Sequence, residues 1–138
     1  MPIDGGNPVR IWEQYGFSQI SPDGKWVLIL DVTSAATKSR IIPASGGQPV
    51  KTFEQDPELG LPMQWTADGR ALLYVKTSSG VSNVWQRPLE GGEAKQLTNF
   101  DSDRITGVIA LSRDGKQLAL ARGFTTSDVV LIKDLNVR

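Results

Sequence analysis

One short motif occurs three times in the chain and restricts its fold more than any other feature. An Asp-Gly pair recurs at Gly24, Gly69 and Gly115, so that successive glycines are 45 and 46 residues apart. A Gly-Gly pair follows the first two copies at the same distance, and its first glycines are Gly46 and Gly91. Two motifs that keep one spacing indicate an internal repeat, and a period of roughly 20–50 residues is typical of solenoids, propellers and arrays.

Each repeat is expected to contain four short strands. Asp-Gly between two apolar runs favours a tight hairpin, because glycine adopts the positive φ that such a turn needs. No window shows a sustained helical period, so the sequence predicts an all-β chain. The expected strands are Phe17–Ile20, Trp26–Leu30, Arg40–Ile42 and Pro49–Phe53 in the first copy, Met63–Trp65, Ala71–Val75, Asn83–Arg87 and Ala94–Leu97 in the second, and Val108–Leu111, Gln117–Ala121 and Asp128–Lys133 in the third.

The second copy carries a family resemblance. Trp65 precedes its Asp-Gly turn, and Gly91-Gly92 is followed by the ending Leu97-Thr98. This pattern resembles the repeat of the TolB-like, WD-repeat-like β-propellers. The resemblance implies a propeller built from four-stranded blades, here three blade units per chain, which is half of a six-bladed ring. It also implies a bacterial protein with a periplasmic or other extracytoplasmic location.

The repeats are expected to form a single propeller domain over residues 1–138. A first Gly-Gly pair at Gly5 places an additional strand at Pro8–Trp12, ahead of the first Asp-Gly turn. Every unit therefore begins with the strand that follows a Gly-Gly pair and continues with the three strands around the next Asp-Gly turn. The approximate units are residues 1–43, 44–88 and 89–138.

Three blades are too few for a closed ring, since propellers have about four to eight. Two chains are therefore expected to associate as a homodimer with six blades. Val9 and Ile11 of one chain would form a ladder with Val130 and Ile132 of the other, which removes exposed sheet edges. The alternative is that the chain is a piece of a longer propeller.

Composition excludes several classes of function. Among the 138 residues, fifteen basic residues balance fifteen acidic ones, so the net charge does not favour nucleic acid. Histidine and cysteine are absent, which excludes a Ser-His-Asp triad, an imidazole base and a thiolate metal site. No apolar run is long enough to cross a bilayer. The sequence predicts no catalytic residue, no metal site, no cofactor and no membrane insertion.

Three charged residues occupy one position of the repeat. Asp31, Lys76 and Arg122 each lie seven residues after an Asp-Gly glycine. A position that serves only the fold would keep its residue type, so the change of charge marks these side chains as candidate ligand-binding residues. The alternative is that they are ordinary solvated strand ends.

The aspartates and tryptophans allow two interpretations each. Asp23, Asp68 and Asp114 could form an acidic cluster, but Asp before Gly is more typical of turn structure. Trp26 and Trp65 are expected to pack between sheets, where aromatic side chains bury much apolar area. Trp12 and Trp85 are kept as candidate ligand-binding residues.

These observations favour a non-catalytic scaffold that binds a protein, a peptide or a small ligand. The binding surface is expected on the face with the variable loops or in the central channel, because loops on a rigid scaffold often carry function. The alternative is the propeller part of a hydrolase or lyase that processes sugars or peptides.

Overall fold

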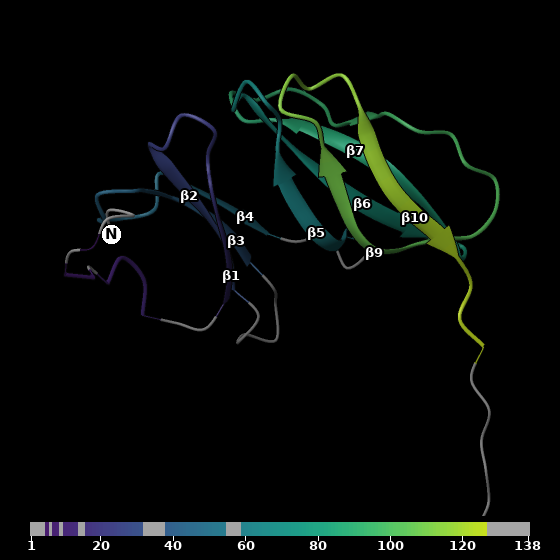
Figure 1. Ribbon diagram of the computed structural model, residues 1–138, viewed down its shortest axis with the longest axis horizontal. Helices are drawn as coiled ribbons and strands as arrows, with labels where there is room; N and C mark the ends of the chain where they lie inside the picture. Colours follow the sequence, from purple (N-terminus) through teal and green to yellow (C-terminus); the bar gives the residue numbers. More distant parts are fainter. Residues whose placement is uncertain are drawn as a thin grey trace, which may run out of the picture.

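The computed structural model describes residues 5, 7, 8, 10–13, 16–31, 38–54 and 59–126. Within these residues the regular structure is β-strand only, and the strands form three antiparallel sheets that follow one another along the chain (Figure 1). The all-β prediction is confirmed, and the arrangement is that of a partial propeller. No helix in the described part is long and apolar enough to cross a membrane.

The first sheet has four strands in chain order. They are β1 (Gly16–Ile20), β2 (Trp26–Asp31), β3 (Lys38–Pro43) and β4 (Lys51–Glu54). The Asp-Gly turn joins β1 to β2, and the Gly-Gly turn joins β3 to β4, as the motifs predict. All four strands expected for this copy are present, with ends that differ by at most two residues.

The second sheet repeats this arrangement with longer strands. Its members are β5 (Leu59–Trp65), β6 (Ala71–Ser78), β7 (Val81–Pro88) and β8 (Lys95–Gln96). The polar segment Thr77–Ser82 forms the end of a tight hairpin between β6 and β7. Ser79 and Gly80 form its turn with φ of 50° and 84°, and the flanking residues continue the ladder.

The third sheet is described through two strands, β9 (Arg104–Leu111) and β10 (Leu118–Gly123). Their pairing is irregular between Leu120 and Arg122, opposite a segment in which Gly107 has a φ of 87°. The expected strand Asp128–Lys133 lies outside the described residues.

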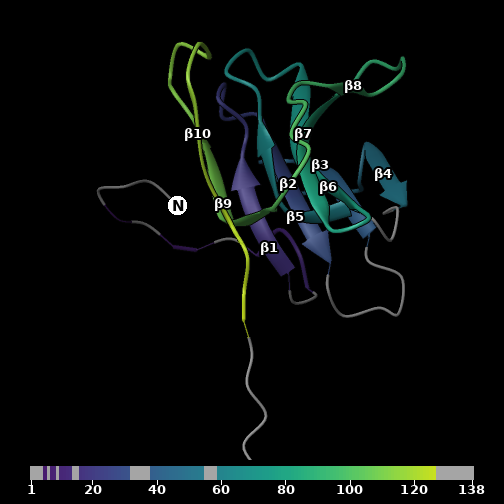
Figure 2. The same cartoon turned by 90° about the vertical axis from the view of Figure 1, so that its right-hand side faces the viewer.

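Each four-stranded sheet combines strands from two sequence units. β4 belongs to the unit 44–88 but pairs with β3 of the unit 1–43. The sheets therefore span residues 16–54 and 59–96, and every one begins with the strand before an Asp-Gly turn. In Figure 2 the first strands β1 and β9 lie on one side of the stack, and the fourth strands β4 and β8 lie on the other.

Two apolar cores join the sheets. Because successive side chains of a strand point to opposite faces, the second strand of the middle sheet serves both of its neighbours. Leu72 and Tyr74 of β6 pack toward the first sheet, and Leu73 and Val75 pack toward the third. Trp65 is buried in the first of these cores with Trp26 against it, which confirms the packing role predicted for both tryptophans.

The segment before β1 lies against the outer face of the first sheet. Ile11 and Trp12 pack on a cluster formed by Val27, Ile29 and Ile42. The described residues of the expected strand Pro8–Trp12 have no strand pairing, so that part of the strand prediction differs from the structure. The segment is held by side-chain packing, whereas a strand requires a ladder partner.

Candidate functional site

The repeated aspartates shape the Asp-Gly turns. The Ser21 hydroxyl donates to Asp23 Oδ1 at 2.6 Å, and the Lys25 amide donates to the same oxygen at 3.1 Å. Both bonds stabilise the ionised carboxylate, so they hold the pKa of Asp23 below its ordinary value. The Ser21 hydroxyl is the larger cause and the Lys25 amide is the next. Gly24 closes the turn with a φ of 72°.

The other two turns have the same hydrogen bonds. Thr66 and the amide of Arg70 donate to Asp68, and Ser112 and the amide of Lys116 donate to Asp114. The pKa values of Asp68 and Asp114 are lowered for the same reasons, with the hydroxyl as the largest cause. Each carboxylate is thus engaged within its own turn. Among the described residues, no group of His, Cys, Asp and Glu could hold a metal ion.

Asp31 is a buried ion-pair residue at the end of β2. Asp31 is only 2% exposed, and the Arg40 guanidinium of β3 donates a hydrogen bond to Asp31 Oδ2 at 2.7 Å. The Arg40 guanidinium also lies 5.1 Å from the centre of the Trp12 ring. These contacts join the candidates Asp31 and Trp12 to one cluster on the first sheet.

Lys76 and Trp85 form a second local pair. The Lys76 ammonium lies 5.9 Å from the centre of the Trp85 ring, a cation–π distance, and the two residues stand on neighbouring strands β6 and β7. Trp85 also packs against the core between the first and second sheets. The Trp85 indole is therefore half-buried: it packs against the core and also contacts the Lys76 ammonium.

Arg122 organises the loop that leads from β8 to β9. Its guanidinium lies 3.8 Å from the centre of the Phe100 ring and donates to the Ser102 carbonyl at 2.6 Å. Asn83 of β7 holds the same loop, because its side-chain oxygen accepts the Phe100 amide at 2.7 Å. The arginine and the asparagine together fix the position of Phe100.

The three charges at the common repeat position thus have separate surroundings. Asp31 pairs with Arg40, Lys76 stacks on Trp85, and Arg122 stacks on Phe100. Of the predicted closure residues, Ile11 lies on the first sheet, and Val9, Val130 and Ile132 lie outside the described residues. The candidate ligand-binding roles stay predictions.

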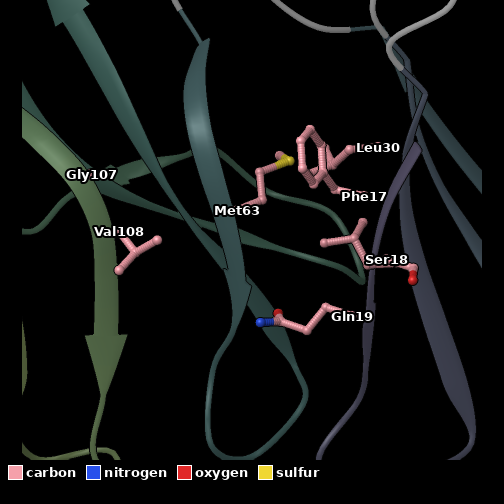
Figure 3. Close-up of a pocket in the computed structure, with 8 residues that line it drawn as sticks. Phe17, Ser18, Gln19, Leu30, Met63, Gly107 and Val108 are labelled. Carbon is pink, nitrogen blue, oxygen red and sulfur yellow. The ribbon is translucent and has the colours of Figure 1, made fainter. Parts of the chain in front are cut away.

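A cavity of about 310 Å³ lies where the first strands of the three sheets approach one another (Figure 3). It is mainly apolar, and two of its side chains are unusually open: Phe17 is 54% exposed and Val108 is 74% exposed. The lining residues are Phe17, Ser18 and Gln19 of β1, Leu28 and Leu30 of β2, Met63 of β5, and Gly107 and Val108 of β9.

Hydrogen bonds fix the wall of the cavity between β1 and β5. Gln19 Oε1 accepts the Trp65 amide at 3.1 Å, and the Gln19 carbonyl accepts Trp65 Nε1 at 3.2 Å. The lining residue Met63 is also held from the first sheet, because the Ser39 hydroxyl of β3 donates to Met63 Sδ at 3.3 Å. The cavity therefore has a constrained wall and an open, apolar mouth, which suits binding of an apolar group.

Sequence reasoning does not identify this cavity. Phe17, Met63 and Val108 belong to expected strands, and nothing in their local pattern distinguishes them from core residues. The available signal is that Phe17 and Val108 occupy the same place, seven residues before an Asp-Gly glycine. Residues in equivalent places of a propeller's first strands converge on the central channel.

The chain is similar to TolB proteins in sequence. It is 30% identical over 76 residues to the Tol-Pal system protein TolB of Francisella tularensis subsp. tularensis (strain WY96-3418), which covers 54% of this chain and 17% of the relative. The TolB of F. tularensis subsp. mediasiatica (strain FSC147) is 29% identical over the same length. The match thus spans about a sixth of these curated relatives. No family model matches the chain.

Solved structures show the same fold. TolB from Acinetobacter baumannii superposes with a TM-score of 0.57 and 24% identity, over 78% of this chain and 26% of that one. A putative TolB from Agrobacterium tumefaciens gives a TM-score of 0.55 and 26% identity, over 73% and 35% of the two chains. Hydrazine synthase from Kuenenia stuttgartiensis also superposes, with a TM-score of 0.55 and 22% identity, over 75% of this chain and 35% of that one. This likeness concerns the fold alone.

The sequence and structural comparisons agree with the internal evidence of the chain. The Asp-Gly and Gly-Gly turns recur with one spacing, and the two complete sheets have the four-stranded antiparallel order of a propeller blade. These findings support the resemblance of the chain to the TolB-like β-propellers, whose fold it shares.

Proposed function

We propose that the chain is a non-catalytic binding scaffold and that its inner cavity receives an apolar side chain of a protein or peptide. The observation that carries this proposal is the cavity of about 310 Å³ lined by residues from all three sheets. Phe17 and Val108 stand open at its mouth. Exposed apolar side chains that gather around a concave site mark binding surfaces more often than isolated ones do.

The size and chemistry of the cavity favour a single side chain over a large cofactor. Ligand pockets commonly measure about 300–1,000 Å³, so this cavity is at the small end of that range. Leu28, Leu30 and Met63 supply an apolar interior. A Leu or Phe side chain in an extended segment satisfies both features.

The family likeness supports a binding role and a location. The curated relatives are named as proteins of the Tol-Pal system, and we extend to this chain a place in a protein assembly. An extracytoplasmic location is part of the same proposal, since it follows from the resemblance to TolB-like repeats.

The proposal is tested by titrating N-acetyl-L-phenylalaninamide into isotope-labelled protein and following NMR shifts. We expect saturable shifts at the methyl groups of Leu28, Leu30 and Met63. Val108→Asp places a carboxylate at the apolar mouth and is expected to weaken binding about tenfold or more.

Val50→Asp is the matched control for this titration. Val50 is 53% exposed, similar to Phe17, but it lies in the turn before β4 and does not line the cavity. This variant is expected to bind the probe as the unmodified chain does. Equal affinity of the Val108→Asp variant, or shifts that gather at the loops instead, would contradict the proposed site.

A further inference from the structure

We propose that a cavity between the second and third sheets binds an aromatic amine, which is a flat ring that carries a protonated amino group. The cavity measures about 310 Å³ and lies beside the Asp-Gly turns of these sheets. It shares no lining residue with the inner cavity, so this inference is independent of the proposed function. Its walls include Asp68, Leu73, Gln86, Leu97, Leu111 and Asp114.

The turns of neighbouring sheets stack in the same way at both interfaces. A Cβ at Gly69 would lie 3.7 Å from Pro22 Cδ, and a Cβ at Gly115 would lie 3.1 Å from Ala67 Cβ. Pro22 and Ala67 occupy the same place in the repeat, two residues before an Asp-Gly glycine. The interface between the first and second sheets can therefore be compared with the next one position by position.

At the first interface an indole fills the space beside the turns. Trp65 is 4% exposed and packs in one cluster with Leu28 and Ile41 of the first sheet. Its ring nitrogen donates to the Gln19 carbonyl at 3.2 Å. Phe53 packs against the same cluster. Aromatic rings thus close this interface.

At the second interface the place of the indole is taken by a smaller side chain. Leu111 is the equivalent of Trp65, since both lie four residues before an Asp-Gly glycine. Gln86 is the equivalent of Ile41, since both lie seventeen residues after such a glycine. The cavity therefore lies where a ring stands at the first interface, and its wall has gained an amide that can form hydrogen bonds.

The rim of the cavity differs from the first interface in the same direction. Phe53 pairs with Ser39, and the Leu97 amide donates to the carbonyl of Val84, the equivalent of Ser39, at 2.8 Å. Leu97 thus stands in the place of Phe53, and it is 42% exposed. An open apolar rim without its ring favours an aromatic ligand, because a ring buries a large apolar area.

The polar contacts that accompany the indole are also incomplete at the second interface. Gln19 Oε1 accepts the Trp65 amide at 3.1 Å. Gln64 occupies the equivalent place, but its Oε1 is buried and has no hydrogen-bond partner within the described part of the chain. A buried acceptor without a donor is unfavourable. Gln64 and Leu111 line one neighbouring cavity, so a ring N–H placed beside Leu111 supplies a donor near this oxygen.

The charge of the cavity selects a cation. The hydroxyls of Thr66 and Ser112 are the largest cause of the lowered pKa values of Asp68 and Asp114, so both carboxylates are ionised at neutral pH. The turn hydrogen bonds reach only the Oδ1 atom of each carboxylate. The ion pairs formed among the described residues involve neither carboxylate. A protonated amine is the group that complements them.

The first turn provides the internal comparison. Its carboxylate, Asp23, lies 3.7 Å from the Lys25 ammonium, and the interface beside it is filled by Trp65. Space for a ring and carboxylates without an ion pair therefore occur together at the second interface and not at the first.

The test is a titration of tryptamine, an indole with a protonated amine, into the isotope-labelled full chain. Saturable NMR shifts are expected at the methyl groups of Leu73, Leu97 and Leu111. 3-Methylindole lacks the amine and butylamine lacks the ring, so each is expected to bind about fivefold more weakly or less.

Two variants fill the cavity from different sides. Leu111→Trp supplies the indole of the first interface, and Leu97→Phe supplies the ring at the exposed rim. Each is expected to weaken tryptamine binding about tenfold or more. The first interface accommodates both rings, so both variants are expected to fold.

A matched pair of variants tests the charge. Asp114→Asn is expected to weaken tryptamine binding about threefold or more and to leave 3-methylindole binding unchanged. Asp23→Asn makes the same change in the equivalent turn, which does not line the cavity, and is expected to bind tryptamine as the unmodified chain does.

Three results would overturn the proposal. They are the absence of saturable shifts with tryptamine, shifts that gather at Leu28 and Leu30 of the inner cavity, and unchanged tryptamine affinity in the Leu111→Trp and Leu97→Phe variants. Equal effects of Asp114→Asn and Asp23→Asn would overturn the assignment of an amine.

Discussion

Hydroxyl–carboxylate pairs define the Asp-Gly turns at the scale of single residues. In each turn a Ser or Thr hydroxyl and a backbone amide donate to one aspartate oxygen, as Ser21 and Lys25 do for Asp23. The same hydroxyl accepts the amide at the start of the next strand, Trp26 in the first turn. The hydroxyl three residues before the glycine is therefore as much a part of the motif as the aspartate.

These carboxylates are expected to contribute to the acid sensitivity of the fold. Their pKa values are lowered in the folded chain, so their stabilisation is present above the unfolded value near 3.8 and is lost as the pH falls through the folded value. Replacing Asp23, Asp68 and Asp114 together by Asn should lower the thermal midpoint at pH 6. It should also reduce the further fall between pH 5 and pH 2.5, measured by circular dichroism.

Asp101→Asn, a substitution in an exposed loop, serves as the control for this series. It should leave the pH profile of the thermal midpoint unchanged. An unchanged profile in the triple Asn variant would show that the turn carboxylates do not favour the folded state.

Arg122 offers a second prediction at this scale. Its guanidinium stacks on Phe100 and donates to the Ser102 carbonyl, so Arg122→Ala should lower the free energy of unfolding by about 1–2 kcal/mol. Arg122→Lys should restore only part of the loss, because an ammonium lacks the planar fork. Urea denaturation measures the free energy of unfolding of both variants. An Arg122→Ala variant as stable as the unmodified chain would show that Arg122 does not stabilise the loop.

Hairpins are the units that carry the fold at the scale of elements. The β6–β7 hairpin is the longest, and its two-residue turn has positive φ at both Ser79 and Gly80. Such a turn matches the right-handed twist of the two strands. It also keeps Lys76 and Asn83 in register at the end of the hairpin.

Gly80→Ala should therefore destabilise the chain by about 1–2 kcal/mol, because a Cβ is unfavourable at a φ of 84°. Gly123→Ala is the matched substitution, since Gly123 lies in a strand with open space where a Cβ would stand and without a positive φ. Chemical denaturation should show a loss only for Gly80→Ala. Equal effects would contradict the turn assignment.

Local chemistry explains which elements the sequence predicts. The Asp-Gly turns and the strands beside them depend on neighbouring residues, so their positions follow from the pattern. Thr77 and Ser82 are polar and suggest a loop, yet they pair across β6 and β7 with their hydroxyl oxygens 2.8 Å apart. Because the two hydroxyls form a hydrogen bond with each other, polar residues can continue the strands here. The polar composition of the segment does not reveal this pairing.

The inner cavity depends on contacts that are distant in sequence. Phe17, Met63 and Val108 come together only because three first strands converge, and no local pattern encodes that convergence. The partners of Asp31 and Arg122 are likewise on other strands or loops, namely Arg40 and Phe100. The position in the repeat identifies Asp31 and Arg122 as equivalent charged residues, but it does not predict which residues they contact.

At the scale of the whole molecule, the three described sheets form a stack in which the middle sheet packs a neighbour on each of its two faces. Side chains of β6 alternate between the preceding and the following sheet, and those of β2 alternate between the segment with Ile11 and Trp12 and the second sheet. The cavity at the inner edge is a consequence of this stacking, because each sheet contributes its first strand. An experiment that locates a ligand in this cavity therefore also tests how the three sheets are stacked.

Contacts between a bound probe and the protein give the most direct test. Isotope-filtered nuclear Overhauser spectra of the chain with N-acetyl-L-phenylalaninamide report which methyl groups lie near its phenyl ring. The account predicts contacts to Leu28, Met63 and Val108, one residue from each sheet. Contacts confined to one sheet, or located at the Asp-Gly turns, would contradict both the convergence of the sheets and the site.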